Sequence, residues 1–185
     1  LAEVREYAQG PKVVAIGEIG LDYYEIEVPD GSSEQEAIAK QKQLFAAQLD
    51  LAKELDLPVV LHIRDSYEDV YDIVKDRGLR GVVHCFSGNL EQAQKFLDIG
   101  YMISFTGVIT FPKTKDLQEV IKNIPLEKIM LETDAPFLAP QRVRGERCEP
   151  AFVKDVAEHI ALTKNLTLEE VASQTTKNAQ GFFKI

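Results

Sequence analysis

Two histidines and two carboxylates stand at or just past the ends of short apolar runs. The runs are VVAIGEIGLD, PVVLHIRD, GVVHCFSG and KIMLETDAP, and they carry Glu18, His62, His84 and Asp134. Each run has the composition of a β-strand, and a segment with helical spacing follows it. In an α/β barrel, successive parallel strands end at the same face, where active sites are built. Imidazole nitrogen and carboxylate oxygen are ligands of Zn, Mn and Mg, so the pattern predicts a metal-dependent hydrolase.

The two strand histidines carry most of this prediction. A single histidine in a strand is more often a hydrogen-bonded structural residue than a metal ligand. Here, two of only three histidines in the chain occupy equivalent places in neighbouring strands, which favours metal binding. Period-two alternation places His84 and Cys85 on opposite faces, so we expect Cys85 to be a small buried hydrophobe. We expect His159, in the middle of a predicted helix, to be a surface or packing residue.

The carboxylates have competing interpretations. Glu18 lies in GEIG, between glycines that let the backbone approach a ligand closely. A carboxylate that ends an apolar strand is costly unless it is paired or metal-bound, and a salt bridge to Arg64 accounts for Glu18 about equally well. Glu132 and Asp134 share one face of KIMLETD, an arrangement suited to a general base that deprotonates water. Asp-Ala-Pro is also ordinary turn chemistry.

Cations and aromatic residues near the same strand ends are candidate substrate contacts. Guanidinium groups match phosphate oxygens, which favours Arg64 and Arg144 over the other two arginines of QRVRGER. The same run is equally typical of a solvated loop in an acidic chain. Tyr23 and Tyr24 follow the first strand, where a ring can stack on a base or cap the barrel.

Alternating strands and helices must position these side chains. The sequence predicts strands at 13–19, 59–63, 81–86, 101–107 and 128–134, and helices at 1–9, 33–56, 67–77, 90–99, 114–124, 152–163 and 167–174. This alternation is typical of βαβ units and a parallel sheet. A complete eightfold barrel usually needs about 250 residues. We therefore expect an α/β, TIM-barrel-like (β/α)8 fold that lacks its first βα units, in one domain over residues 1–185; the alternative is an open doubly wound sheet.

Composition limits the classes of protein to consider. The net charge of −9 argues against a general nucleic-acid coat protein, but not against an enzyme whose bound divalent ions invert the charge of its pocket. No run of ~18 apolar residues indicates a membrane span, and the N-terminal segment does not resemble a signal peptide. Two cysteines suit a reducing cytoplasm, which is the expected location. The sequence does not indicate an oligomeric state.

Several motifs in the same order resemble the TatD family of metal-dependent deoxyribonucleases. They are GEIGLDYY, PVVLHIRDSYEDVYDIVK, GVVHCFSG, GYMISFTGVITF, LETDAPFLAP and RGERCEP, from about Val13 to the C-terminus. The resemblance implies a (β/α)8 barrel of the amidohydrolase superfamily that hydrolyses DNA phosphodiester bonds, here at single-stranded ends, with two divalent ions (Mg, Mn or Zn).

The resemblance also implies roles for individual residues. Glu18 is expected to bridge two metal ions, and His62 and His84 to bind one of them. Asp134 is expected to bind the other ion and to handle the proton of the attacking water. Glu132 and Arg64 are expected to support the ligands or orient the phosphate.

Two departures from the family pattern leave alternatives open. The family carries an H-x-H pair on its first strand, and this chain contains no such motif. The loop that often reads H-R-G-x-x-N-x-P is VRGERCEP at 143–150, without the histidine and the asparagine. The alternatives to a deoxyribonuclease are a superfamily hydrolase of an ester or aminoacyl-tRNA link, and a catalytically incomplete fragment.

Overall fold

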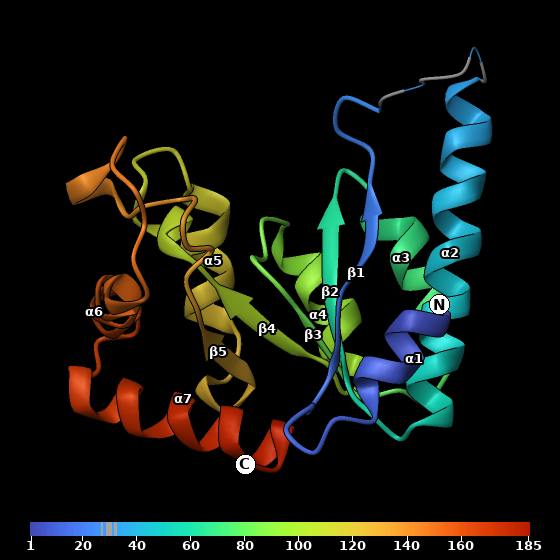
Figure 1. The fold of residues 1–185 in the computed structure, drawn as a ribbon. Coiled ribbons are helices and arrows are strands. Elements are labelled where there is room, and N and C mark those ends of the chain that lie inside the picture. Colours follow the sequence, from blue (N-terminus) through green and yellow to red (C-terminus); the bar gives the residue numbers. More distant parts are fainter. Residues whose placement is uncertain (27, 29–30, 32) are drawn as a thin grey trace. The chain divides into compact units, whose positions relative to one another are not determined.

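The computed structural model describes residues 1–26, 28, 31 and 33–185, in which strands alternate with helices (Figure 1). The strands are β1 (Ile16–Asp22), β2 (Val59–Arg64), β3 (Gly81–Val83), β4 (Met102–Phe105) and β5 (Ile129–Leu131). The α-helices are α1 (Ala2–Ala8), α2 (Glu34–Glu54), α3 (Tyr67–Val74), α4 (Leu90–Asp98), α5 (Lys115–Asn123), α6 (Val153–Lys164) and α7 (Leu168–Phe183). Short 3-10 turns are η1 (Gly107–Thr110), η2 (Leu126–Lys128), η3 (Gln141–Val143) and η4 (Pro150–Phe152). The chain forms two compact units, Leu1–Val83 and His84–Ile185, and no described helix has the length and apolar character needed to cross a bilayer.

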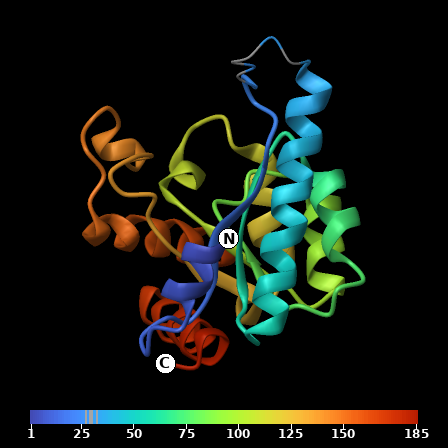
Figure 2. The ribbon, with the colours of Figure 1, turned by 45° about the vertical axis from the view of Figure 1, so that its right-hand side comes forward.

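In the first unit, β1, β2 and β3 pair in that order and in parallel. Helices α2 and α3 lie side by side next to these strands, and α2 packs against β1 (Figure 2). Helix α2 begins at a capping box in which Ser33 and Glu36 satisfy each other's backbone N–H groups, as the sequence predicts. Phe45 and Leu49 of α2 are fully buried, as is Leu21 of β1. Each such side chain stabilises the fold by about 1.5–3 kcal/mol, so this packing holds the ends of β1 and β2 in place.

The second unit is built on the parallel pair β4 and β5. Helix α4 packs on β4 and α7 packs on β5, while α6, seen end-on in Figure 1, contacts α5 and α7. Helix α7 continues to Phe183 instead of ending at the predicted Gln174. The reason is a tertiary contact: Asn178, in the added part of the helix, donates hydrogen bonds to the carbonyls of Leu126 and Ile129. Packing of the far end of α7 therefore outweighs its weak sequence signal.

The first strand was predicted too early in the sequence, at 13–19 instead of Ile16–Asp22. Strand β1 begins at Ile16 and ends at Asp22, so Glu18 lies inside the strand and not at its end. Its register with β2 shifts between Ile16 and Ile19, and Gln41 of α2 hydrogen-bonds the backbone of Asp22 on both sides. This anchoring from α2 extends the strand beyond the apolar run that predicted it.

Three other strands end earlier than predicted: β4 ends at Phe105, and the early ends of β3 and β5 change the place of site residues. Strand β3 stops at Val83, and Cys85 adopts a left-handed backbone with φ of +45°. A strand cannot continue through this conformation, so the predicted alternation between His84 and Cys85 does not exist. Strand β5 stops at Leu131, which places Glu132 and Asp134 in the loop that follows it and not on one strand face.

Gly20 allows β1 to approach β2 at His62. The two residues are partners in the parallel register, and a Cβ at position 20 would lie 1.8 Å from the carbonyl oxygen of His62. We expect Gly20→Ala to destabilise the protein by about 2–4 kcal/mol in urea unfolding, because backbone must move. Gly181→Ala, in α7 with open space around it, is the control and should be neutral or stabilising by up to about 1 kcal/mol. A loss below about 1 kcal/mol for Gly20→Ala would contradict this view of the strand pair.

His159 is a packing residue, one of the two roles predicted for it. Its Nε2 lies 3.0 Å from the amide oxygen of Gln118, and burial lowers the pKa of the ring. The unfolded chain therefore takes up a proton at a higher pH than the folded chain does, so stability is lost as the pH falls below the usual histidine range. We expect His159→Gln to flatten the fall in unfolding free energy between about pH 7.5 and 5. Parallel stability curves for the two proteins would show that His159 does not cause the fall.

Candidate active site

The first unit brings together Glu18, His62 and a third residue, Asp22. The imidazole of His62 lies between two carboxylates, with Nδ1 2.7 Å from Oε1 of Glu18 and Nε2 2.9 Å from Oδ2 of Asp22. The three side chains are 36–42% exposed, so a ligand can reach them. The neutral ring has one N–H and one lone pair, which makes one nitrogen available as a ligand.

Asp22 is a site residue that the sequence reasoning missed. A signal for it exists, because residues 18, 20 and 22 share one face of β1 while Ile19 and Leu21 are buried on the other. The predicted strand ended at Ile19, so this face was not extended to Asp22. Arg64, the predicted alternative partner of Glu18, instead has its Nη1 3.9 Å from Oδ2 of Asp22.

The two tyrosines after β1 have different environments. The hydroxyl of Tyr23 donates a hydrogen bond to Asp69 at 2.7 Å, and Lys42 pairs with the same carboxylate. Burial and the neighbouring Asp69 raise the pKa of Tyr23 above its usual range. Tyr24 is 47% exposed, and the guanidinium carbon of Arg64 lies 3.8 Å from its ring centroid. Tyr23 is thus held against α3, whereas Tyr24 presents its ring together with a cation.

The second unit brings together His84, Glu132 and Asp134. Nδ1 of His84 lies 2.8 Å from Oε2 of Glu132, whose Oε1 accepts the backbone N–H of Cys85 at 2.7 Å. Nε2 of His84 lies 3.7 Å from Oδ1 of Asp134. The His84 side chain is only 12% exposed, so its ring is fixed by packing as well as by Glu132. Nε2 is the nitrogen that faces the second carboxylate.

Cys85 is only partly buried, so the expectation of a buried hydrophobe is wrong. The left-handed turn at this residue, directly after β3, is the physical reason. Its sulfur lies 3.1 Å from the hydroxyl of Thr106, which is buried at the end of β4. The turn also aims the Cys85 backbone N–H at Glu132, so this backbone helps to hold the carboxylate that contacts His84.

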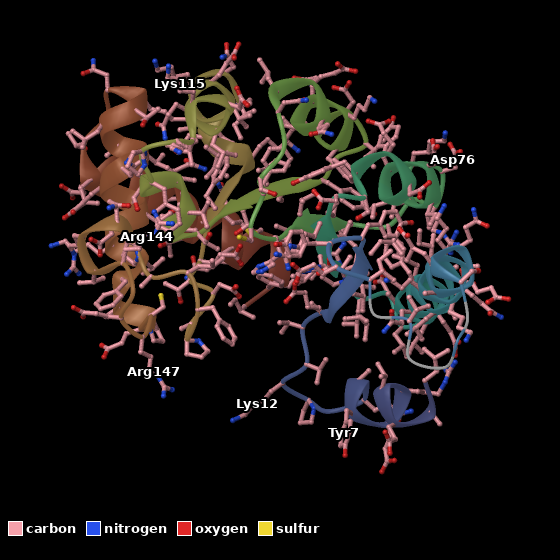
Figure 3. The ribbon with its side chains drawn as sticks, turned by 90° about the horizontal axis from the view of Figure 1, so that it is seen from above. Tyr7, Lys12, Asp76, Lys115, Arg144 and Arg147 are labelled. Carbon is pink, nitrogen blue, oxygen red and sulfur yellow. The ribbon has the colours of Figure 1, made fainter. Side chains whose placement is uncertain are left out.

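The arginines of the loop after β5 are held in different ways. The guanidinium carbon of Arg144 lies 4.4 Å from the centroid of the Phe111 ring, and the side chain is exposed. Arg142 forms an ion pair with Asp155, which raises the pKa of the guanidinium. Arg147 is exposed and points away from the body of its unit in Figure 3. The guanidinium carbon of Arg142 also lies over an aromatic ring, 4.9 Å from the centroid of Phe152, so Arg144 differs from Arg142 in the carboxylate that pairs with Arg142.

The donor types in both sets fit a divalent metal ion. Imidazole nitrogen with carboxylate oxygen is the usual ligand chemistry of Zn and is also compatible with Mn. In this structure the imidazoles contact the carboxylates directly. Within the described part of the chain, no group of three or more His, Cys, Asp and Glu residues is arranged around an ion position. In each set, one ring nitrogen contacts a carboxylate that can serve as its outer partner.

A family model described as TatD related DNase matches residues 1–184. The chain belongs to the TatD-related DNase family. It is 44% identical over 188 residues to YabD of Bacillus subtilis, an uncharacterized metal-dependent hydrolase, covering 100% of this chain and 71% of that protein. It is 38% identical over 192 residues to the 3'-5' ssDNA/RNA exonuclease TatD of a Rahnella species, covering 100% of this chain and 70% of that protein. At the level of the family, the chain is a metal-dependent hydrolase of the TatD type.

A solved structure of the same family confirms the fold class. The crystal structure of YJJV, a TatD homologue from Escherichia coli K12, matches with a TM-score of 0.87 and 33% identity, covering 100% of this chain and 70% of that one. The predicted α/β, TIM-barrel-like fold class is therefore correct.

Proposed function

We propose that this member of the TatD-related DNase family hydrolyses phosphodiester bonds at the ends of single-stranded DNA. The observation that carries the proposal is the pair of imidazole–carboxylate sets, one at His62 and one at His84, in a chain of this family. The name of the Rahnella relative, a 3'-5' ssDNA/RNA exonuclease, supports a nucleic acid as the substrate.

The proposed metal ligands are Glu18, His62, His84 and Asp134, which would hold divalent ions such as Mg, Mn or Zn. A bound divalent ion lowers the pKa of water and stabilises negative charge on phosphoryl oxygens. Glu132 keeps Nδ1 of His84 occupied, which leaves Nε2 as the ligand atom.

Asp134 is proposed to have a second role in proton transfer from water, and further side chains are proposed to bind the substrate. Asp134 accepts the proton of the attacking water, because its carboxylate is half-exposed beside His84. Arg64 and Arg144 pair with non-bridging phosphate oxygens, as exposed guanidinium groups can. Tyr23 supports the loop that carries Tyr24, and the exposed Tyr24 ring is suited to stacking on a base.

The same proposal includes the setting in which the chain works. Residues 1–185 are proposed to act as one hydrolase domain. The family resemblance implies two ions in the full-length site, and the H-x-H pair that would complete the ion at Asp134 is not present in this sequence. The cytoplasm is the proposed location, which fits two cysteines, Cys85 and Cys148, that are not joined in a disulfide.

A substrate panel tests this function. The 185-residue chain is incubated with Mg²⁺, Mn²⁺ or Zn²⁺ and with end-labelled single-stranded DNA, blunt duplex DNA, single-stranded RNA, a simple carboxylic ester and aminoacyl-tRNA. We expect single-stranded DNA to be shortened from an end, and His159→Gln to cut at the wild-type rate. Faster turnover of the ester or aminoacyl link, or no cleavage with any metal at loaded sites, would contradict the proposal.

A further inference from the structure

The carboxyl end of β1 is anchored from helix α2. The side chain of Gln41 accepts the backbone N–H of Asp22 at 2.9 Å and donates to the Asp22 carbonyl at 2.9 Å. The next residue, Tyr23, donates its backbone N–H to the carbonyl of Arg64 in β2. The backbone of Asp22 is therefore fixed on both sides before its side chain makes any contact.

The carboxylate of Asp22 is also directed. Oδ1 accepts the backbone N–H of Tyr24 at 3.0 Å, which leaves Oδ2 to meet Nε2 of His62 at 2.9 Å. The opposite ring nitrogen, Nδ1, faces Glu18 at 2.7 Å. An acid of this kind has two possible roles beside a candidate ligand: it binds the ion itself, or it orients the imidazole. The surrounding hydrogen bonds favour the second role, because both oxygens of Asp22 already have partners.

We propose that Asp22 is a positioning residue that holds the Nε2–H of His62, so that Nδ1 is presented with Glu18 as a metal ligand. The inference rests on the proposed function, since it assigns the ligand atom of His62. A ligating imidazole usually donates its other N–H to a carboxylate, which fixes the tautomer and raises the basicity of the ligand atom. Glu132 stands in the same relation to His84, but through Nδ1, so the two histidines use different nitrogens.

The test combines Zn²⁺ affinity with the tautomer of His62. Zn²⁺ affinity is measured by competition with a chelator, and the protonated ring nitrogen is identified by long-range ¹⁵N–¹H NMR of the Zn²⁺-loaded chain. We expect wild type to carry the hydrogen of His62 on Nε2. Asp22→Ala should weaken Zn²⁺ binding about 10–100-fold, and Asp22→Asn, whose amide oxygen still accepts Nε2–H, should recover part of this loss. Asp76→Asn, an exposed acid after α3, is the matched control and should bind as wild type does (Figure 3).

A second variant separates positioning from loss of folding. Gln41→Ala leaves the Asp22 carboxylate intact but removes its backbone anchor, so we expect weaker Zn²⁺ binding with the Nε2–H tautomer retained. Unchanged affinity in Asp22→Ala, or a Zn²⁺-loaded wild type with the hydrogen on Nδ1, would overturn the role of Asp22 alone. A wild-type chain that binds no Zn²⁺, or a His62→Ala chain that binds it equally well, would overturn the proposed function together with this inference.

Discussion

Replacing His84 with alanine is expected to abolish measurable metal-dependent DNA cleavage and to weaken Zn²⁺ binding by more than about a hundredfold. Loss of a residue that only supports a ligand typically costs 10–100-fold in metal affinity, and loss of the ligand itself should cost more. His84 is only 12% exposed and contacts Glu132 through Nδ1, so alanine at this position leaves Glu132 without its imidazole partner. Initial rates on end-labelled single-stranded DNA and chelator competition measure the two effects.

Two variants serve as controls for His84. His159→Gln removes a histidine of the same unit that packs on Gln118, and it should keep both activity and metal affinity. Glu132→Gln should give an intermediate loss, because the amide still contacts the ring without the charge. His84→Ala protein that remains folded and cuts DNA at more than a tenth of the wild-type rate would show that His84 is not a ligand.

The second large effect is expected for Asp134→Asn, which should lower kcat by about 10²–10⁴ with a smaller change in KM. The amide cannot accept the proton of the attacking water, whereas the shape of the side chain and its loop are kept. The backbone carbonyl of Asp134 accepts the N–H of Phe137 at 2.6 Å, and the substitution leaves this turn intact. Steady-state rates at saturating metal measure kcat and KM separately.

The same substitution at another aspartate, Asp98, is the control for Asp134→Asn. Asp98→Asn changes an exposed carboxylate at the end of α4, which accepts a hydrogen bond from Gln94, and it should leave kcat unchanged. If Asp134→Asn raises KM but preserves kcat, Asp134 acts in metal or substrate binding and not in proton transfer.

The order of strands and helices was predictable because each apolar run is followed by a segment with helical spacing. Ser33 with Glu36 marked the start of α2, and the fold class follows from this alternation. The ends of the strands were not predictable, because they depend on contacts from distant residues. Gln41 extends β1 to Asp22, and the left-handed turn at Cys85 stops β3 before His84.

The candidate site was predicted only in part, because some of its contacts depend on where strands end and how loops fold. The contact of Glu18 with His62 joins residues on the adjacent strands β1 and β2. His84 and Glu132 follow β3 and β5, which are not neighbours in the strand order, so their contact depends on the loops that carry them. Asp22 was missed because the predicted strand ended at Ile19, before it reached this residue. The choice between Tyr23 and Tyr24 depends on a loop conformation in which Asp69 takes the hydroxyl of Tyr23, and a single sequence does not encode this visibly.

Metal content after equilibrium dialysis is the most direct measure of whether this chain binds ions through its strand-end histidines. Wild type and three variants, His62→Ala, His84→Ala and His159→Gln, are dialysed against Zn²⁺ or Mn²⁺ and analysed for bound metal per chain. If Glu18, His62, His84 and Asp134 are ligands, wild type and His159→Gln retain metal while the other two variants lose it. Equal metal content in all four proteins, each shown to be folded, would contradict metal binding at these residues.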